Sequence, residues 1–416
     1  MIDLHTPAGR GGKVIEVTSL EDSGPGTLRE AFADSSPHII VFRVGGTIEL
    51  ERPIFIETPF VTVAGQTAPG DGITIKGHGI VINTHDVLLQ YLRVRPGLAA
   101  NGGIYIAGSE PNFDGTYNVV VDHVSASWVG VDAETMSIFN GAHDVTISQS
   151  IISESLEPYG HGMLVGYGAY NTSIYHNLFA HNRQRNPHIT DGGTHDIVNN
   201  VIYNWYFGAA GIQERDSSGP SNSFVNGIGN YFLDGHSTDK HPELFEFLLS
   251  GPEGSVPKLF VSGNIGRHRP DDSQNEWALV GTYRIPGVPS GAASEIYRSP
   301  TRFSAAPISA SSAPEAFEHV LAQAGATAPK RDAVDERIIK EVRNKTGTLI
   351  TSPEEVGGYP VLAPGTAPAD SDHDGIPDEW EIDHYLNEND AADGNKDQDG
   401  NGYTNIEEYL HSLMKK

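Results

Sequence analysis

The sequence has no cysteine among its 416 residues, which excludes disulfides, thiolate metal sites and cysteine nucleophiles. Charged residues are only 19% of the chain and aromatic residues 8%, yet a hydrophobic fraction of 38% is enough for a core. Wholesale disorder and a coiled coil are therefore excluded. No apolar run approaches the roughly 18 residues of a membrane span, and positions 1–12 lack the apolar centre of a signal peptide. We expect a soluble protein.

Positive charge is also scarce. The chain has 27 Lys and Arg against 54 Asp and Glu, a net charge of −27, which repels nucleic acids and anionic membranes at long range. We expect neither as a partner. The charge is uneven, because fourteen carboxylates and a single lysine fall between Thr366 and Glu408. Such a segment is either a solvated tail or a cation site.

What the sequence does have is a repeat. Short β-branched runs recur from about Lys13 to Gly266, and no helix-length segment bridges the later ones. A small polar residue takes the same place in successive runs, at Ser125, Ser150, Asn177, Asn200, Asn230 and Asn264. This spacing without helices is typical of a right-handed parallel β-helix, so we predict an all-β solenoid. The asparagines further predict a ladder of hydrogen-bonded amides inside it.

Helices are expected at the ends of this repeat. Leu28, Ala31 and Phe32 fall on one face of a short helix that would cover the open N-terminal edge. Two amphipathic helices are predicted after Pro314, and both should pack on the solenoid. Their apolar residues are Phe317, Val320 and Leu321 in the first and Val334, Ile338, Ile339 and Val342 in the second. Residues 361–369, rich in Pro, Ala and Gly, read as a linker.

The C-terminal segment contains two copies of the twelve-residue calcium loop, with oxygen ligands at alternate positions, glycine at the sixth and glutamate at the twelfth. The first copy offers Asp370, Asp372, Asp374, the Ile376 carbonyl, Asp378 and Glu381. The second offers Asp397, Asp399, Asn401, the Tyr403 carbonyl and Glu408. Trp380, Ile382, Tyr385, Ile406, Tyr409 and Leu410 are expected to form a small core shared by the two loops. We predict structural Ca²⁺ here, because no base or nucleophile is interspersed.

The segment from Asn118 to Trp205 carries VVVDHVSASW, VDAETMS, GHGMLVG, YHNLFAHNRQRNPHI and VNNVIYNW. It resembles the pectate lyases of polysaccharide lyase family 1 and their close bacterial relatives, and the resemblance extends over about Gly11 to Pro360. The last segment resembles the dockerin-like or thrombospondin-type-3-like calcium modules that follow many secreted bacterial enzymes. We therefore expect a lyase domain over 1–360, a linker over 361–369 and a calcium module over 370–416.

The resemblance implies a parallel β-helix that cleaves polygalacturonate or a related polyuronate by calcium-assisted β-elimination. It assigns the base to Arg185, in Arg-Asn-Pro, and a calcium ligand pair to Asp132 and Glu134. Arg183, two positions before Arg185, would face the same substrate cleft if this stretch is a strand. His161 stands where characterised members have a substrate-binding lysine. His188 and His176 are the remaining candidate substrate contacts, although a stacking or ladder role also suits His176.

This chain departs from the family pattern at three places. Gly103 stands near the position of an expected aspartate, His161 replaces the lysine, and His188 and Thr190 occupy the neighbourhood of a second arginine. A polygalacturonase-like hydrolase is one alternative, since Gly77-His78-Gly79 and Gly160-His161-Gly162 supply a tripeptide of that family. No paired-aspartate segment supports it. A non-catalytic polysaccharide-binding β-helix is the other alternative.

These inferences predict the setting in which the protein works. The expected partner is an anionic plant or algal polysaccharide, the expected cofactor is Ca²⁺, and the protein is expected to act as a monomer. A polymeric substrate cannot enter a bacterial cell intact, so we expect the protein to be secreted or periplasmic.

Overall fold

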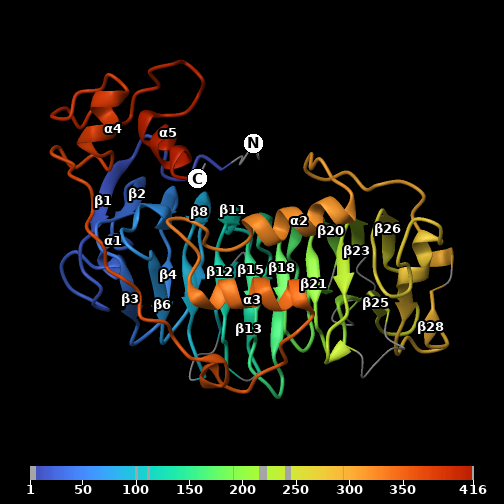
Figure 1. Ribbon diagram of the computed structural model, residues 1–416. Coiled ribbons are helices and arrows are strands. Elements are labelled where there is room, and N and C mark those ends of the chain that lie inside the picture. Colours follow the sequence, from blue (N-terminus) through green and yellow to red (C-terminus); the bar gives the residue numbers. More distant parts are fainter. Residues whose placement is uncertain are drawn as a thin grey trace.

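The chain forms a parallel β-helix, as predicted (Figure 1). The computed structural model describes residues 6–98, 102–109, 113–130, 132–190, 192–214, 223–238, 245–293 and 295–414. Each turn adds one short strand to each of three sheets, and all strand pairs are parallel except the last, β27 with β28. Short strands without bridging helices follow from β-branched runs that are interrupted by glycine and polar turn residues.

The strands of each sheet are given in chain order. The first sheet contains β1 (Lys13–Val17), β2 (His38–Phe42), β5 (Val61–Ala64), β8 (Val87–Gln90), β11 (Tyr117–Asp122), β14 (His143–Ser148), β17 (Tyr170–Tyr175), β20 (Gly193–Val198), β23 (Ser223–Ile228) and β26 (Lys258–Ser262). The second contains β3 (Gly46–Glu49), β6 (Ile73–Lys76), β9 (Arg93–Arg95), β12 (Ser125–Ser127), β15 (Ile151–Ser153), β18 (Leu178–Ala180), β21 (Val201–Tyr203) and β24 (Tyr231–Leu233). The third contains β4 (Ile54–Ile56), β7 (Ile80–Ile82), β10 (Ile104–Ala107), β13 (Glu134–Phe139), β16 (His161–Val165), β19 (His188–Thr190), β22 (Ala210–Gln213), β25 (Phe247–Ser250), β27 (Val280–Thr282) and β28 (Gly291–Ala292).

The interior of the coil is filled by apolar side chains stacked in register from turn to turn. One row of the first sheet consists of Val63, Leu89, Val121, Ile147, Ile174 and Ile197, all fully buried. Each such side chain stabilises the fold by about 1.5–3 kcal/mol relative to an exposed one. The same alternation directs the intervening residues outward, and on the third sheet these form the site described below.

The predicted amide ladder is confirmed. Nδ2 of Asn177 donates to Oδ1 of Asn200 (3.1 Å), Asn200 donates to Asn230 (3.1 Å), and Asn230 donates to Asn264 (2.9 Å). Each amide oxygen also accepts from the backbone N–H of the preceding asparagine, and Ser150 N–H begins the row by donating to Asn177 (2.9 Å). All of these amides are buried. The ladder satisfies backbone N–H groups at one corner of the successive turns from Ser150 to Asn264.

The flanking helices are also confirmed. α1 (Leu28–Ala31) lies at the N-terminal end with Leu28, Ala31 and Phe32 buried. α2 (Ala313–Gln323) begins with a Ser312–Glu315 capping box, and α3 (Ala333–Asn344) is capped by Asp332. Both lie across the strands of the second sheet (Figure 1). Their buried residues share a cluster with the sheet: Val320, Leu321, Val334, Ile338, Val342, Trp128, Ile151 and Leu178. Phe317 and Ile339 are partly buried against it.

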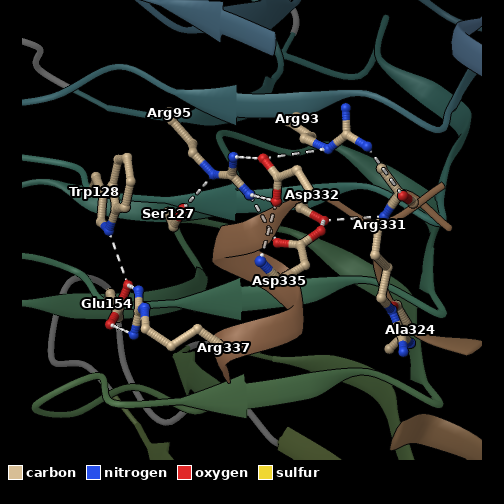
Figure 2. Close-up of polar contacts among 12 residues, drawn as sticks. Arg93, Arg95, Ser127, Trp128, Glu154, Ala324, Arg331, Asp332, Asp335 and Arg337 are labelled. Atoms are coloured by element: carbon tan, nitrogen blue, oxygen red, sulfur yellow. Dashed lines mark hydrogen bonds and ion pairs between the residues drawn. The ribbon is translucent and has the colours of Figure 1, made fainter. Parts of the chain in front are cut away.

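A buried set of charges fastens α3 to the second sheet (Figure 2). We call Arg93, Arg95, Asp332 and Asp335 the α3 ion network. The fully buried Arg95 contacts both carboxylates, with Nη2 3.1 Å from Asp332 Oδ1 and 2.8 Å from Asp335 Oδ1. Arg93 Nη1 donates to the Asp71 carbonyl (2.8 Å) and its Nε lies 3.6 Å from Asp332. Two cations therefore face two anions.

The C-terminal segment is docked on the solenoid. α4 (Asp378–Asp383) and α5 (Asn405–Ser412) lie beside β1 and β2 (Figure 1). Ile376, Ile406, Tyr409 and Leu410 are buried against Ile39, Val41 and Ala64 of the first sheet, with Trp380 partly buried. The predicted small core is confirmed for Trp380, Ile406, Tyr409 and Leu410, and the prediction is wrong for Ile382 and Tyr385. Ile382 and Tyr385 are 58% and 91% exposed, because the outer face of the solenoid supplies the other half of the core.

Residues 361–369 carry no regular structure and are held on the surface. Ala363 exchanges two hydrogen bonds with Asp71, at 2.9 and 3.0 Å, and Arg43 donates to the Pro368 carbonyl. The segment predicted as a linker therefore contacts the solenoid at Ala363 and Pro368. The remaining elements are the 3-10 helices η1 (Gly65–Thr67), η3 (Glu276–Leu279), η4 (Glu295–Tyr297) and η5 (Pro353–Val356). Over the described ranges, we find no helix with the length and hydropathy needed to span a bilayer.

Candidate active site and calcium loops

A groove of about 440 Å³ lies on the third sheet. Its outward side chains alternate with core residues: Ser137 and Phe139 of β13, Leu164 of β16, and His188 and Thr190 of β19. Glu134 and His161, the first residues of β13 and β16, are register partners and also line the groove. Arg185 comes from the loop before β19. The solenoid therefore brings together residues that are far apart in the sequence.

Three of the predicted residues meet at one point. The Arg185 guanidinium contacts the Glu134 carboxylate, and His161 Nδ1 lies 3.7 Å from the same Oε1 atom, at ion-pair rather than hydrogen-bond distance. Burial alone raises the pKa of Glu134, but the neighbouring His161 and the Arg185 charge outweigh it, so the pKa lies below its usual range. Glu134 is thus a carboxylate at neutral pH, and it holds a cationic group on the floor of the groove.

Arg183 does not share this face. The stretch is a loop with a single bridge between Gln184 and His161, and Arg185 has a positive φ of 65°. Arg183 instead donates to Glu157 (2.7 Å), and its guanidinium lies 4.3 Å from the Tyr206 ring centre. The prediction that two arginines line the cleft from one strand is wrong, because alternation holds only in an extended strand.

Asp132 is exposed and lines the same groove as Glu134. The aspartate expected near Gly103 cannot be accommodated without rearrangement. A Cβ at Gly103 would lie 2.2 Å from the Thr135 carbonyl oxygen, and one at Gly102 would lie 2.2 Å from the Tyr105 ring. Tyr105, a lining residue that the sequence reasoning missed, occupies this part of the groove. Its burial, together with the Glu134 charge, raises its pKa to about 12.

His188 lies farther along the groove, toward the second hollow described next. Its Nε2 is 3.0 Å from Gln213 Oε1. A second hollow of about 310 Å³ shares Arg185, His188 and Gln213 with the first, so the groove continues toward β25 and β27. Gln213 and Arg284, which line this continuation, were also missed. Arg284 lies outside the repeat, in a segment rich in Pro, Ser and Ala, so no periodic signal could have located it.

His176 is not a groove residue. It stacks on Tyr175 with ring centres 4.0 Å apart and lies 4.3 Å from the His319 ring of α2, on another side of the solenoid. Burial, with a smaller effect from His319, lowers its pKa to about 3. Its assignment as a substrate contact is wrong, and the stacking role is confirmed.

The first of the two predicted calcium loops forms a compact group of acids. Asp370, Asp372 and Asp374 place carboxylate oxygens within 4.8 Å of one another, and Asp374, Glu381 and Asp393 do the same. We call these five residues the acid cluster. Five of its buried oxygens accept no hydrogen bond: Asp372 Oδ2, Asp374 Oδ2, Glu381 Oε1 and Oε2, and Asp393 Oδ1. Burial, then mutual repulsion, raises the pKa of Asp374 to about 7 and of Glu381 to about 8. Oxygens without partners in this number fit a divalent cation.

The structure changes the expected ligand set at one position. Both Asp378 oxygens accept hydrogen bonds from Ser371, at 2.6 Å from its N–H and 2.8 Å from its hydroxyl. Asp393, twelve residues after Glu381, directs a buried oxygen without a partner into the cluster instead. Asp393 could not be selected from the sequence, because it lies outside the twelve-residue spacing.

The second loop is more open. Asp397, Asp399 and Asn401 are exposed, and Asp397 accepts from the N–H groups of Gly400 (2.8 Å) and Gly402 (2.9 Å). The Asn401 amide donates to Asp399 and Glu408, at 2.9 Å each. Within the described ranges, groups of three or more Asp, Glu or His ligands this close together occur only in the acid cluster. The two loops that look alike in sequence therefore differ in structure.

No family model matches the chain. A probable pectate lyase C from Aspergillus flavus is 37% identical over 420 residues, covering 98% of this chain and 90% of that protein. A second, from Aspergillus terreus, is 36% identical with the same coverage. A solved pectate lyase from Bacillus sp. N165, in complex with trigalacturonate, has a TM-score of 0.51 at 16% identity and covers 78% of this chain and 96% of that one. That likeness supports the fold alone. These two relatives are fungal, so the expected bacterial kinship is not supported.

Proposed function

The chain belongs to the pectate lyase family, and we propose that it cleaves polygalacturonate or a closely related polyuronate by β-elimination in the groove of the third sheet. The observation that carries the proposal is the meeting of Arg185, Glu134 and His161 on the groove floor. A polymer can lie along this groove because it is open and continues across the strands from β10 to β27. Both the family and the geometry thus favour a lyase.

The reaction removes the proton on C5, next to the uronate carboxylate. The electrons of that C–H bond form the C4–C5 double bond, and O4 leaves with the C4–O4 pair and takes up a proton. We assign the removal of the C5 proton to Arg185. A guanidinium cation has no free electron pair, so Arg185 can accept the C5 proton only after releasing one of its own protons to solvent. This role therefore rests on the family resemblance together with the position of Arg185 in the groove. Glu134 orients the guanidinium through their contact.

The groove residues suit calcium in part. Asp132 and Glu134 offer the carboxylate oxygens that Ca²⁺ prefers, but two side chains are too few for its six to eight ligands. Uronate carboxylates and water would have to complete the shell. Bound there, the ion would neutralise the carboxylate next to C5. His161 and His188 contribute hydrogen-bonding groups to the same wall, where they can contact sugar hydroxyls or a carboxylate.

A second calcium site is proposed at the acid cluster, with Asp370, Asp372, Asp374, Glu381 and Asp393 as side-chain ligands and the Ile376 carbonyl of the loop. The unpartnered oxygens support this site. The second loop, with Asp397, Asp399, Asn401, Tyr403 and Glu408, is proposed as a weaker site because its oxygens are exposed and already hydrogen-bonded. We further propose that the protein acts as a monomer outside the cytoplasm, where polymeric pectate is found.

Ultraviolet absorbance during incubation with polygalacturonate tests the reaction, because only elimination creates the conjugated double bond. We expect a rise that requires calcium and stops with excess chelator. Arg185→Ala should lower the rate by about 10²–10⁴-fold, whereas Arg298→Ala, which removes an exposed arginine outside the groove, should not. New reducing ends without absorbance would indicate a hydrolase. Binding without either product would indicate a non-catalytic module.

A further inference from the structure

The end of the groove near β25 and β27 differs chemically from the end that holds Asp132 and Glu134. The 310 Å³ hollow there contains Arg185, His188 and Arg284, and none of its described lining residues is acidic. This is notable in a chain with twice as many acidic as basic residues. A hollow lined by two arginines and by no described carboxylate suits an anion, although Arg185 is already paired with Glu134.

Glycines line part of this hollow. Gly208 and Gly211 contribute no side chains, and the His188 ring occupies the space above Gly211, where a Cβ would lie 2.2 Å from Nδ1. His188 is fixed there by its contact with Gln213 (3.0 Å). A Cβ at Gly208 would meet only Leu248 Cδ2, at 4.0 Å, so the open space for a sugar ring lies at Gly208.

Aromatic rings form the wall. Phe207 and Tyr283 lie edge to face, with centres 5.5 Å apart and planes at 80°. The Arg284 guanidinium lies 4.8 Å from the Tyr283 ring centre, a cation–π distance that limits its orientations. In the described part of the chain no carboxylate forms an ion pair with Arg284, which is exposed at the rim. An aromatic wall next to an uncompensated guanidinium suits an acidic sugar, whose ring can stack while its carboxylate accepts hydrogen bonds.

We propose that this hollow is a uronate subsite in which Arg284, with His188, binds one sugar carboxylate directly, without a metal ion. The inference rests on the proposed function, which it deepens. It assigns the two ends of the groove different means of neutralising a polyanion: calcium between carboxylates at Asp132 and Glu134, and protein cations at Arg284. Arg284 is then a specificity residue that favours unesterified over methyl-esterified uronate at this subsite.

Steady-state kinetics on unesterified oligogalacturonides of increasing length tests the subsite. Arg284→Gln should raise KM about tenfold for oligomers long enough to reach it, with little change in kcat, and the penalty should grow with chain length. Arg284→Lys should restore part of the loss. Arg298→Gln, an exposed arginine on the same segment that pairs with Glu295 at 3.6 Å, is the matched control and should leave KM unchanged. Thermal unfolding of each variant checks that the fold is intact.

Several outcomes would overturn the subsite. An unchanged KM at every length in Arg284→Gln, while the wild type remains active, would exclude it and leave the lyase proposal standing. An equal loss in Arg298→Gln would reduce it to a general electrostatic effect. If the wild type does not cleave polygalacturonate, calorimetric titration with oligogalacturonides replaces the kinetics. Binding that Arg284→Gln weakens about tenfold supports the subsite without the reaction, and binding that it leaves unchanged excludes the subsite.

Discussion

Two parts of the molecule bury several charged groups, and they do so in opposite ways. In the α3 ion network two arginines face two aspartates, and the fully buried Arg95 contacts both carboxylates (Figure 2). In the acid cluster five carboxylates face one partly exposed cation, Arg43, whose Nη1 lies 3.6 Å from Asp370. Both lie where a C-terminal element docks on the solenoid: α3 on the second sheet, and the two predicted calcium loops on the first.

The difference shows how a buried charge can be compensated. The α3 ion network is complete within the polypeptide, so its stability depends on keeping every partner. The acid cluster leaves five buried oxygens without a hydrogen bond, which the chain alone cannot compensate. The second arrangement is stable only if the acids take up protons or a cation. Removing an arginine from the α3 ion network, or calcium from the acid cluster, tests whether the two regions differ in this way.

The largest effect is expected when the balanced network loses a cation. Arg95→Met removes the cation that contacts both buried carboxylates, Asp332 and Asp335, and should lower the free energy of unfolding by about 3–5 kcal/mol. Urea denaturation, followed by circular dichroism, measures it. The matched control is Arg343→Met, which removes an exposed arginine of α3 that pairs with Glu318. This change should lower the free energy of unfolding by less than about 1 kcal/mol. Equal effects of the two variants would mean that burial does not distinguish these ion pairs.

The next largest effect is expected from calcium at the acid cluster. Calcium at a hundredfold excess over Kd should stabilise the wild type by about 2.7 kcal/mol relative to chelated protein. The unfolding transition that calcium shifts should be that of the docked C-terminal segment. Its Ile376 and Ile406 pack on the first sheet beside the loop. Calorimetric scans with and without chelator measure the shift, and an identical melting profile in both would contradict a site here.

Two matched variants separate the ligand set seen in the structure from the one expected from spacing. Asp393→Asn should weaken calcium binding about tenfold or more, as loss of a buried ligand does. Asp378→Asn should leave the calcium Kd nearly unchanged, because its oxygens are taken by Ser371. Isothermal titration of both variants with calcium decides between the two ligand sets. A larger rise in Kd for Asp378→Asn than for Asp393→Asn would support the ligand set expected from the twelve-residue loop.

A rise in pH should stabilise the α3 ion network and destabilise the calcium-free acid cluster. Burial raises the pKa of Asp332, but the charge and hydrogen bonds of Arg95 lower it by more than burial raises it. The resulting pKa is about 2. A lowered carboxyl pKa gives stability that is present above about pH 4 and lost toward pH 2, here roughly 2 kcal/mol. Burial and the Asp332 charge raise the pKa of Asp335, so the loss in acid is assigned to Asp332.

In the calcium-free acid cluster, the raised pKa values of Asp374 and Glu381 mean that the folded state holds protons more tightly than the unfolded state. Stability should therefore fall as pH rises from about 4 to about 8, by up to about 1.4 kcal/mol per pH unit for each group. Calcium should abolish this slope. Thermal scans from pH 4 to pH 8, with and without calcium, measure it, and a calcium-free stability that is flat over this range would contradict the burial of these acids.

The sequence predicted the periodic features because they repeat. The ladder from Asn177 to Asn264 and the alternating core residues recur at every turn, so a single chain is enough to detect them. The loop motif identified Asp370, Asp372, Asp374 and Glu381 by spacing. Asp393, Arg284 and the partners of Arg95 were missed because each depends on a contact between segments far apart in the chain. Arg183 was misplaced for a related reason, since one loop breaks the alternation that the sequence pattern suggested.

The smallest expected effect concerns Arg43, whose guanidinium lies near the acid cluster. Its guanidinium is shared between Glu16, 3.2 Å from Nε, and Asp370, and it is about one-fifth exposed, so each contact is partly screened. Arg43→Gln should tighten calcium binding about two- to fivefold, because a positive charge near the site repels the ion, and should lower the calcium-free stability by about 0.2–1 kcal/mol. In this one variant, titration should therefore show tighter calcium binding, while denaturation should show a less stable calcium-free protein. Weaker calcium binding in this variant would mean that Arg43 positions Asp370 rather than competing with the ion, and the two regions would then be more alike than their charges suggest.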